Sequence, residues 1–356
     1  MWRLPRKTVA LFGVCLAVAA VVVAGATAST KSTKASVQVC VLLPDTKSSV
    51  RWVQFDAPAM KAAFAKAGVS ASINNALNDP LKQKAQAQAC IAAGATVVIE
   101  TALDNGSAAS IEKLFTSKGG KAIDYDRQVS GGSASVYVTF DGKAVGEAQA
   151  KGVLAGMKAN GTGNGTVAEL WGGQTDQNAF WFKSGNDAVF NPLFKSGAIK
   201  KGPQQFVPDW DANNAATIFS QMLVKTNNNI QGVLAANDNI AGAVIADLKA
   251  KHLKALPLSG QDASVAGIQN IISGWQTGTV YKYVPDEANA AAAAAVALIK
   301  NQTPKTNGYR LNGKVKEPTE ALPVVWITKA NYTRLFTDKF LKKSDVCVGT
   351  YKQYCK

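Results

Sequence analysis

Short apolar runs typical of buried strands alternate with amphipathic stretches typical of helices along most of this chain. In the first half, the pattern predicts strands at residues 37–43, 70–74, 96–100 and 121–125, and helices at 55–68, 80–93 and 108–117. Strands that alternate with helices of about 10–15 residues indicate β-α-β units and a parallel sheet. We therefore predict an α/β fold.

A second set of the same kind begins near Asp141. The pattern predicts helices at residues 143–158, 178–190, 212–226, 240–250 and 286–299, and strands at 166–170, 204–207, 232–235, 256–259, 279–284 and 322–328. The last elements follow two apparently complete halves, and such late elements usually return to an earlier domain. We predict one lobe from residues 36–140 plus 282–322, a second from 141–281 plus 326–345, and a cysteine-bearing tail at 346–356. Three crossings, near Phe140, Tyr281 and Val325, would form a hinge.

The first 28 residues have the features of an export signal. Arg3, Arg6 and Lys7 precede an apolar stretch at residues 9–25, and residues 26–28 form an Ala-x-Ala cleavage site. The alternative is an uncleaved membrane anchor, since residues 8–27 are almost long enough to span a bilayer. We expect cleavage near Ala28 and a mature chain that is exported, either to the periplasm or to the cell surface.

Cysteine usage agrees with export to an oxidising compartment. Beyond the signal, the chain contains Cys40, Cys90, Cys347 and Cys355. Four cysteines allow three sets of pairs, and the sequence does not choose among them. Cys347 with Cys355 would close a small C-terminal loop, and Cys40 with Cys90 would join the first strand to the second helix. No Cys-x-x-Cys pair is present, so we expect no metal site.

The net charge of +15 comes from lysines that are dispersed over helix faces and the C-terminal tail. A nucleic-acid partner would require them in a groove or along one helix. We interpret the charge as a solvated surface that anionic envelope polymers would attract. The chain has no P-loop, no Gly-x-Ser-x-Gly and a single histidine, His252, so we expect neither a cofactor nor catalysis.

Polar side chains follow several of the predicted strands where each strand ends. Asp126 and Arg127 follow one strand, and Asn178, Asn237 and Asp262 belong to similar clusters in the second half. In open parallel sheets, ligands bind outside the carboxyl ends of the strands. These donors and acceptors suit a neutral polyhydroxylated molecule, so the sequence predicts ligand capture. Two alternatives remain open, a surface ion pair between Asp126 and Arg127 and a helix cap at Asn237.

Several segments, in order along the chain, resemble one family. They are Arg51-Trp52-Val53-Gln54-Phe55-Asp56, Tyr125-Asp126-Arg127, Gly172-Gly173, Asn178-Ala179, Asp209-Trp210, Ala236-Asn237-Asp238, Leu258-Ser259-Gly260-Gln261-Asp262 and Thr279-Val280-Tyr281-Lys282. The chain thus resembles the periplasmic sugar-binding proteins of ABC importers, in the ribose/galactose/xylose branch and most of all its xylose-binding members. The resemblance covers almost the whole mature chain.

The resemblance implies a periplasmic binding protein of type I, with two Rossmann-like lobes that close on a monosaccharide such as a xylose-like aldopyranose. It implies stacking of the sugar between Trp52 and Trp210. The hydrogen-bonding residues that it implies are Arg51, Asp126, Arg127, Asn178, Asn237, Asp262 and Lys282. The remaining tryptophans within apolar or helical runs are expected in the core or hinge, namely Trp171, Trp181, Trp275 and Trp326.

Three departures from the family pattern leave the identity of the sugar open. Residues 44–50 lack an expected acidic pair and basic residue, residues 180–183 (Phe-Trp-Phe-Lys) replace a basic pair, and the tail at 346–356 is foreign to the family. We expect a monomer that delivers its sugar to an ABC permease in the membrane, with no nucleic-acid partner. The alternatives are a sugar-sensing or adhesive module without transport and, third, a saccharide-active enzyme.

Overall fold

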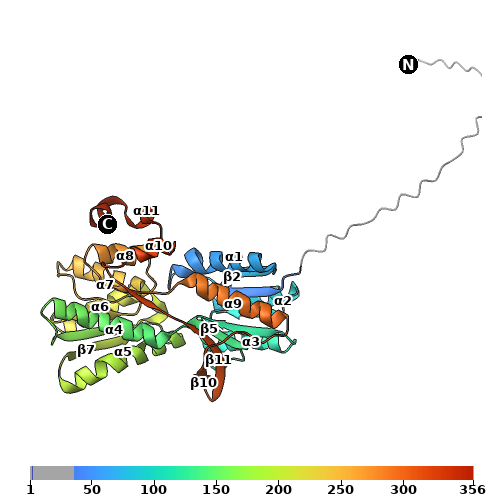
Figure 1. The fold of residues 1–356 in the computed structure, drawn as a ribbon, viewed down its shortest axis with the longest axis horizontal. Helices are drawn as coiled ribbons and strands as arrows, with labels where there is room; N and C mark the ends of the chain where they lie inside the picture. Colours follow the sequence, from blue (N-terminus) through green and yellow to red (C-terminus); the bar gives the residue numbers. More distant parts are fainter. Residues whose placement is uncertain (1, 3–35, 356) are drawn as a thin grey trace, which may run out of the picture. The chain divides into compact units, whose positions relative to one another are not determined.

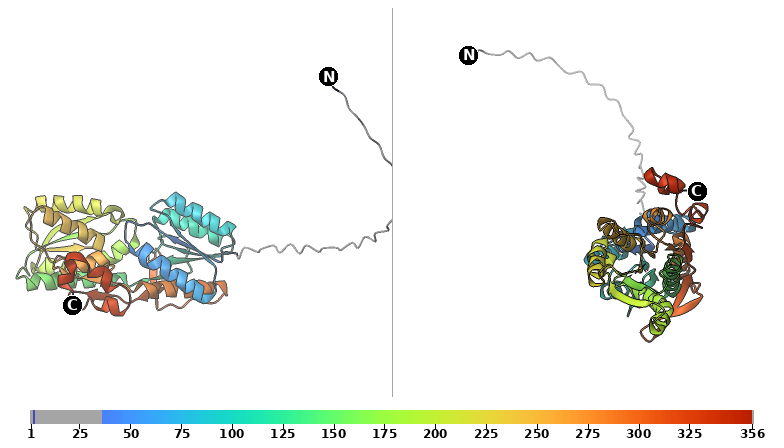
Figure 2. Two further views of the ribbon diagram at one scale, coloured as in Figure 1. Left: turned by 90° about the horizontal axis from the view of Figure 1, so that it is seen from above. Right: turned by 90° about the vertical axis from the view of Figure 1, so that its left-hand side faces the viewer.

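The computed structural model describes Trp2 and residues 36–355, so nearly all of the predicted export signal lies outside the described residues. Residues 36–355 belong to one compact unit that contains both lobes. No helix within the described part of the chain is long and apolar enough to cross a membrane. Figures 1 and 2 show this unit as two α/β lobes.

The first lobe is built on a seven-stranded sheet with the order β10-β11-β5-β4-β3-β1-β2. The strands are β1 (Val39–Leu43), β2 (Ala71–Asn75), β3 (Val97–Glu100), β4 (Lys121–Tyr125), β5 (Val136–Phe140), β10 (Gly308–Asn312) and β11 (Val315–Leu322). Only the β10–β11 pair is antiparallel. All the other strand pairs are parallel. The carboxyl ends of these strands, where the polar residues follow, therefore lie along one edge of the sheet.

Four helices cover the two faces of this sheet. They are α1 (Ala57–Ala67), α2 (Pro80–Ala92), α3 (Asn105–Thr116) and α9 (Val284–Ile299). Val39 and Val41 of β1 pack toward α1 and α9, whereas the alternate residues Cys40 and Leu42 pack toward α2 and α3. The apolar run of β1 is continuous because both of its faces are buried.

The second lobe has a three-stranded parallel sheet with the order β7-β6-β8. Its elements are β6 (Thr166–Trp171), β7 (Lys200–Phe206), β8 (Gly232–Ala235), α4 (Gly142–Ala159), α5 (Gln177–Ser196), α6 (Ala212–Lys225), α7 (Asp238–Ala250) and α8 (Val265–Ile272). Helices α4 and α5 pack on one face of the sheet, and α6 and α7 pack on the other. The predicted α/β class is confirmed.

The chain passes between the two lobes three times. The crossings follow β5, β9 (Thr279–Tyr281) and β11, and the last leads to β12 (Val325–Ile327). Strands β9 and β12 form a separate antiparallel pair beside the crossings. The two Rossmann-like lobes thus share a hinge of three segments.

Several elements differ from the sequence prediction, among them α8, which lies where no helix is predicted. Residues 256–259 form no strand but a single parallel bridge between Leu258 and Val233, because Pro257 has no N–H to continue a ladder. Strand β5 is absent from the predicted set. Its apolar residues lead directly into the first crossing, and the sequence pattern does not distinguish a strand from a crossing segment there. The β10–β11 hairpin is likewise unpredicted, because its strand sequences expose polar residues on both faces.

The described part of the chain contains two disulfides. Cys40 of β1 pairs with Cys90 of α2, and Cys347 pairs with Cys355. The C-terminal segment contains α10 (Arg334–Thr337), α11 (Lys343–Val346) and a final 3-10 turn (Gly349–Tyr354), and it lies over α8 in Figure 1. Of the three pairings that the sequence allows, the structure has the one that joins neighbours in the fold.

Candidate functional site

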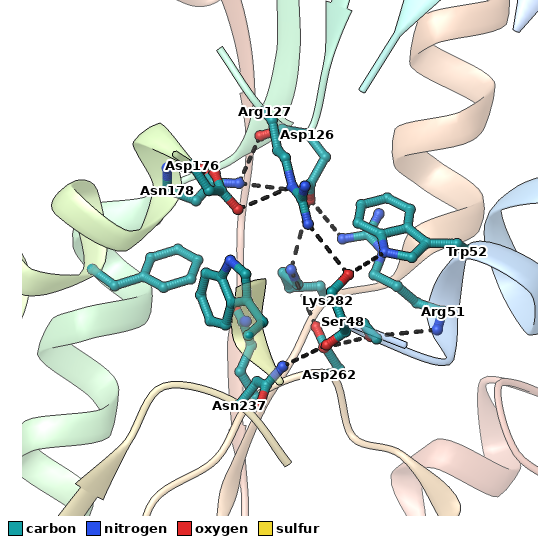
Figure 3. Close-up of a pocket in the computed structure, with 14 residues that line it drawn as sticks. Ser48, Arg51, Trp52, Asp126, Arg127, Asp176, Asn178, Asn237, Asp262 and Lys282 are labelled. Atoms are coloured by element: carbon teal, nitrogen blue, oxygen red, sulfur yellow. Dashed lines mark hydrogen bonds and ion pairs between the residues drawn. The ribbon is translucent and has the colours of Figure 1, made fainter. Parts of the chain in front are cut away.

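A pocket between the two lobes contains every side chain that the sequence nominates. Its lining comprises Ser48, Ser49, Arg51, Trp52, Asp126, Arg127, Asp176, Asn178, Phe182, Trp210, Asn237, Gln261, Asp262 and Lys282. Figure 3 shows these side chains converging from both lobes. Little space is left between these side chains.

The local sequence explains why these groups meet. Asp126 directly follows β4 with a left-handed φ of 61°, which turns the chain out of the strand. Asn178 lies in the first turn of α5, after β6, and Asn237 is the N-cap of α7, after β8. Each position is at the carboxyl end of a parallel strand, where open α/β sheets bind their ligands.

The two predicted stacking rings line this same pocket from opposite lobes. Trp52 belongs to a π-helical turn (Trp52–Asp56) ahead of α1, and its Nε1 donates to Ser48 Oγ at 3.1 Å. Trp210 lies beside Gly172, where a Cβ would overlap the indole. Each ring also contributes to the core of its own lobe, so packing and pocket lining coexist. An aromatic face suits the C–H surface of a sugar ring.

The other four tryptophans named above pack against or within the core of the second lobe, as expected from their apolar surroundings. Phe182 is a further aromatic wall of the pocket, with its ring 6.2 Å from that of Trp210 in an edge-on arrangement. The second lobe thus offers the pocket two aromatic side chains rather than one.

Arg51 is the centre of a buried ion-pair network. Its Nη1 lies 2.6 Å from Asp126 Oδ2, and its Nη2 lies 2.6 Å from Asp56 Oδ1 and 2.5 Å from Glu287 Oε2. Burial alone would lower the pKa of Arg51, but its acidic partners, with Asp126 first, raise it well above its usual value. Arg51 is therefore a fixed positive charge that holds Asp126 toward the pocket.

Asp126 is an acceptor in its charged form. Burial would raise the pKa of its carboxyl group, but Arg51, Lys282 and Arg127 together bring that pKa below its usual value. Lys282 Nζ lies 3.2 Å from Asp262 Oδ1 and 3.7 Å from Asp126 Oδ2. A lysine between two carboxylates can donate to a ligand hydroxyl while both acids accept from the same ligand.

Asn178 and Asp176 connect the second lobe to the first. The Asn178 amide donates to the backbone oxygen of Asp126 at 2.8 Å, and Arg127 forms an ion pair with Asp176 at 2.9 Å. Asp126 and Arg127 are almost fully buried. The alternative of an exposed ion pair between these two neighbours is therefore wrong, because each has partners elsewhere.

Ser49 and Asn237 form further contacts between the lobes at the pocket. Ser49 Oγ donates to Asp262 Oδ2 at 2.7 Å, and the Asn237 amide donates to the backbone oxygen of Ser48 at 2.9 Å. The Asn237 side-chain oxygen also accepts from the Ile240 N–H at 2.9 Å. Asn237 is thus both a helix cap and a pocket residue, so the two interpretations of this position do not compete.

Four buried polar atoms of pocket residues have no hydrogen-bond partner among the described residues. Arg127 Nε and Asp262 Oδ1 still take part in ion pairs, whereas Trp210 Nε1 and Gln261 Oε1 do not. One is a donor and the other an acceptor. Buried polar groups are normally hydrogen-bonded. These atoms therefore mark positions at which a hydroxylated ligand would gain contacts.

Five pocket residues are absent from the sequence-based set. Asp176 and Gln261 belong to polar clusters that the sequence pattern identifies, but that pattern predicts ligand contact only for their neighbours Asn178 and Asp262. Ser48 and Ser49 lie in the segment 44–50 that departs from the family pattern, and Phe182 lies in the other such segment. The two serines follow strand β1, and this position is the one signal that the sequence offers for them. No pattern distinguishes Phe182 from a core residue.

The chain matches the family model described as periplasmic binding protein domain over residues 39–303. It is 32% identical to the D-xylose-binding periplasmic protein of Escherichia coli (strain K12), over 78% of this chain and 84% of that protein. It is 27% identical to the multiple sugar-binding periplasmic receptor ChvE of Rhizobium radiobacter, over 84% of this chain and 89% of that protein.

A solved structure, a carbohydrate transporter solute binding protein from Chloroflexus aurantiacus in complex with D-glucose, is also similar. It is 30% identical, covers 86% of this chain and 97% of its own, and superposes with a TM-score of 0.78. The family consists of transport receptors, not enzymes. This chain therefore belongs to the periplasmic binding protein family, as a sugar-binding solute receptor of an ABC transporter.

Proposed function

We propose that this receptor binds a xylose-like aldopyranose between Trp52 and Trp210 and delivers it to an ABC permease as an exported monomer. The observation that carries the proposal is that these two rings, from opposite lobes, line one pocket together with all the nominated polar residues. The export signal, with cleavage near Ala28, is part of the same proposal. The closed lobes would present one shape to the permease.

The chemistry of the pocket supports a sugar. A pyranose has apolar C–H faces and a rim of hydroxyl groups, and stacking on aromatic rings adds about 0.5–1.5 kcal/mol beyond burial. Asp126, Asp262, Asn178 and Arg127 surround the rings with acceptors and donors. A site that pairs with each hydroxyl rejects analogues that lack one, because its own buried groups would remain unpaired.

A pentose is favoured over a hexose by the aromatic wall at Phe182. A pentopyranose has no exocyclic hydroxymethyl group, so it presents one hydroxyl fewer to the pocket. Phe182 has no donor or acceptor to pair with such a hydroxyl, and the empty space is small. The relatives bind different sugars by name, D-xylose in one case and multiple sugars in another, so the selectivity must come from such local differences.

Calorimetric titration with D-xylose and D-glucose tests the proposal. We expect the parent protein to bind D-xylose more tightly, and Trp210→Ala and Asp126→Asn each to lose at least about tenfold in affinity, equivalent to about 1.4 kcal/mol. Trp275→Ala is the matched control, because this indole packs on Lys249 outside the pocket. Affinities of both pocket variants within threefold of the parent would contradict the proposed site.

Phe182→Ala tests the choice of sugar separately. This variant should bind D-glucose relatively better, so that the ratio of the D-xylose to the D-glucose affinity falls. An unchanged ratio would mean that Phe182 does not select between the two sugars. Delivery to a permease is tested by reconstituting the transporter in proteoliposomes, where sugar-loaded receptor should stimulate ATP hydrolysis and the Trp210→Ala variant should not.

A further inference from the structure

The C-terminal segment, residues 329–355, contacts both lobes. Leu335 and Val346 are fully buried and pack with Ile268 and Ile271 of α8 in the second lobe. Phe55 of the first lobe packs against the same cluster. The segment, red in Figures 1 and 2, therefore belongs to neither lobe alone.

Phe340 makes the contact that joins the two sides. Its ring stacks on Phe55 at a centroid distance of 4.2 Å and an interplanar angle of 17°. It also meets Tyr281 edge-on at 4.9 Å. Phe340 is only 7% exposed, so most of its surface is used in these and neighbouring contacts. Aromatic pairs of both geometries are favourable beyond simple burial.

Both ring partners belong to segments that also carry residues of the pocket. Phe55 is in the π-helical turn that begins at Trp52, directly after Arg51. Tyr281 ends β9, immediately before Lys282. One side chain of the C-terminal segment thus touches both the first-lobe turn and the hinge strand that supply a stacking ring and two cations to the pocket.

The segment is itself fixed to the second lobe. The Gln269 side chain of α8 donates to the backbone oxygen of Val346 at 3.1 Å, and the Tyr281 hydroxyl donates to Asp338 Oδ2 at 3.2 Å. The disulfide between Cys347 and Cys355 closes a loop in the last residues of the described chain. The part of the chain that carries Phe340 is therefore anchored by these contacts and is not a free chain end.

We propose that Phe340 is a positioning residue for sugar binding, which keeps the turn of Trp52 and the strand of Lys282 in the arrangement that the closed pocket requires. It does not touch the pocket. Its effect is on the fraction of receptor in the binding-competent arrangement, and the apparent affinity falls in proportion to that fraction. This inference rests on the proposed function, because it assumes that the sugar binds between the lobes.

The test compares Phe340→Ala, Phe340→Tyr and Phe336→Ala with the parent by calorimetric titration of D-xylose and D-glucose, using the sugar that the parent binds more tightly. Phe336 is the matched control, because its ring contact, with Tyr332, lies within the segment. We expect Phe340→Ala to lose about tenfold in affinity, within the usual range of coupling between sites. Phe340→Tyr, which keeps the ring, should recover to within threefold, and Phe336→Ala should stay within threefold.

Other results would overturn the inference. Phe340→Ala with parental affinity would show that the ring does not position the pocket. Equal losses in Phe340→Ala and Phe336→Ala would show that general destabilisation of the segment is responsible. A Phe340→Tyr variant as weak as Phe340→Ala would show that the ring contacts are not the cause.

Failure of the proposed function is recognised separately. A parent protein that binds neither sugar would contradict the proposed function, and the positioning role would then be decided by small-angle X-ray scattering of the sugar-free proteins. We expect Phe340→Ala to have a larger radius of gyration than the parent and Phe336→Ala, because the lobes lose a contact that joins them. Identical values for all three would overturn the positioning role.

Discussion

The Glu287→Gln variant should change how the stability of this receptor depends on pH. Glu287 of α9 is fully buried, and its Oε2 lies 2.5 Å from Arg51 Nη2. Arg51 also pairs with Asp56 and Asp126, so three carboxyl groups share one guanidinium. Burial raises the pKa of Glu287 to about 8, with Arg51 opposing the shift and the two aspartates adding to it. At neutral pH the Glu287 carboxyl group is therefore mostly protonated.

The sign and size of the effect follow from this shift. An ordinary glutamate has a pKa of 4.5, so between that pH and about 8 the folded protein holds one more proton than the unfolded chain. The stability from this proton is fully present below pH 4.5 and is lost as the pH rises through 8. At about 1.4 kcal/mol per pH unit inside the window, the parent should lose about 2.5 kcal/mol from this group between pH 6 and pH 9. Glutamine keeps an acceptor for Arg51 but does not titrate. The free energy of unfolding of the variant should therefore show no such loss from position 287.

Urea denaturation of parent and variant at pH 6, 7.5 and 9 measures the difference. The free energy of unfolding of Glu287→Gln relative to the parent should rise by about 2.5 kcal/mol across this range. Glu147→Gln is the control, since Glu147 pairs with the exposed Lys151 on α4, and its offset from the parent should stay constant. A constant offset for Glu287→Gln as well would refute the assignment of a proton to this carboxyl group.

Three further perturbations test other parts of the structure. Gly172→Ala should weaken sugar binding by about tenfold in a fluorescence titration, because the new methyl group would displace the Trp210 indole; parental affinity would show that this indole does not bind the sugar. Replacing Cys40 and Cys90 together by serine should lower the free energy of unfolding by about 2–5 kcal/mol, and equal denaturation curves would argue against a structural disulfide. Asp176→Asn removes a charge from the ion pair across the pocket and should weaken sugar binding severalfold with little change in Tm, whereas an equal loss of both would indicate a purely structural role.

The fold was accessible from the sequence because its signals are local. Apolar runs such as that of β1 alternate with helices whose starts are marked by caps, as where Asp79 accepts from the N–H groups of Leu81 and Lys82. Predicted and observed elements differ mainly at their ends. Three exceptions, β5, the β10–β11 hairpin and residues 256–259, depend on pairing with distant strands, and no local pattern specifies such pairing. Helix α8 is a fourth exception, although its N-cap Ser264 is a local signal that the prediction does not use.

The pocket was partly accessible for a related reason. Strand ends place polar residues on one edge of a parallel sheet, so Asp126 and Asn237 could be nominated before their partners were known. Which member of a polar cluster faces the pocket depends on turn geometry, so the sequence does not distinguish Asp176 and Gln261 from their neighbours. The contact of Phe340 with Phe55 joins distant parts of the chain, and the sequence contains no signal for it.

The polar contacts across the pocket bear on how a sugar would close this receptor. Ser49 with Asp262, and Asn237 with the backbone of Ser48, join the lobes directly. Asn178 with the backbone of Asp126, and Arg127 with Asp176, join them as well. A neutral hydrogen bond contributes a net of about 0.5–1.5 kcal/mol, and one to a charged group about 1.5–3 kcal/mol. A sugar that touches both lobes adds further contacts, and it stabilises the same arrangement as these pairs. The lobe-to-lobe contacts therefore set how much of the sugar's binding energy is used in closure, so that stronger pairs would raise affinity while making the closed shape less dependent on the sugar.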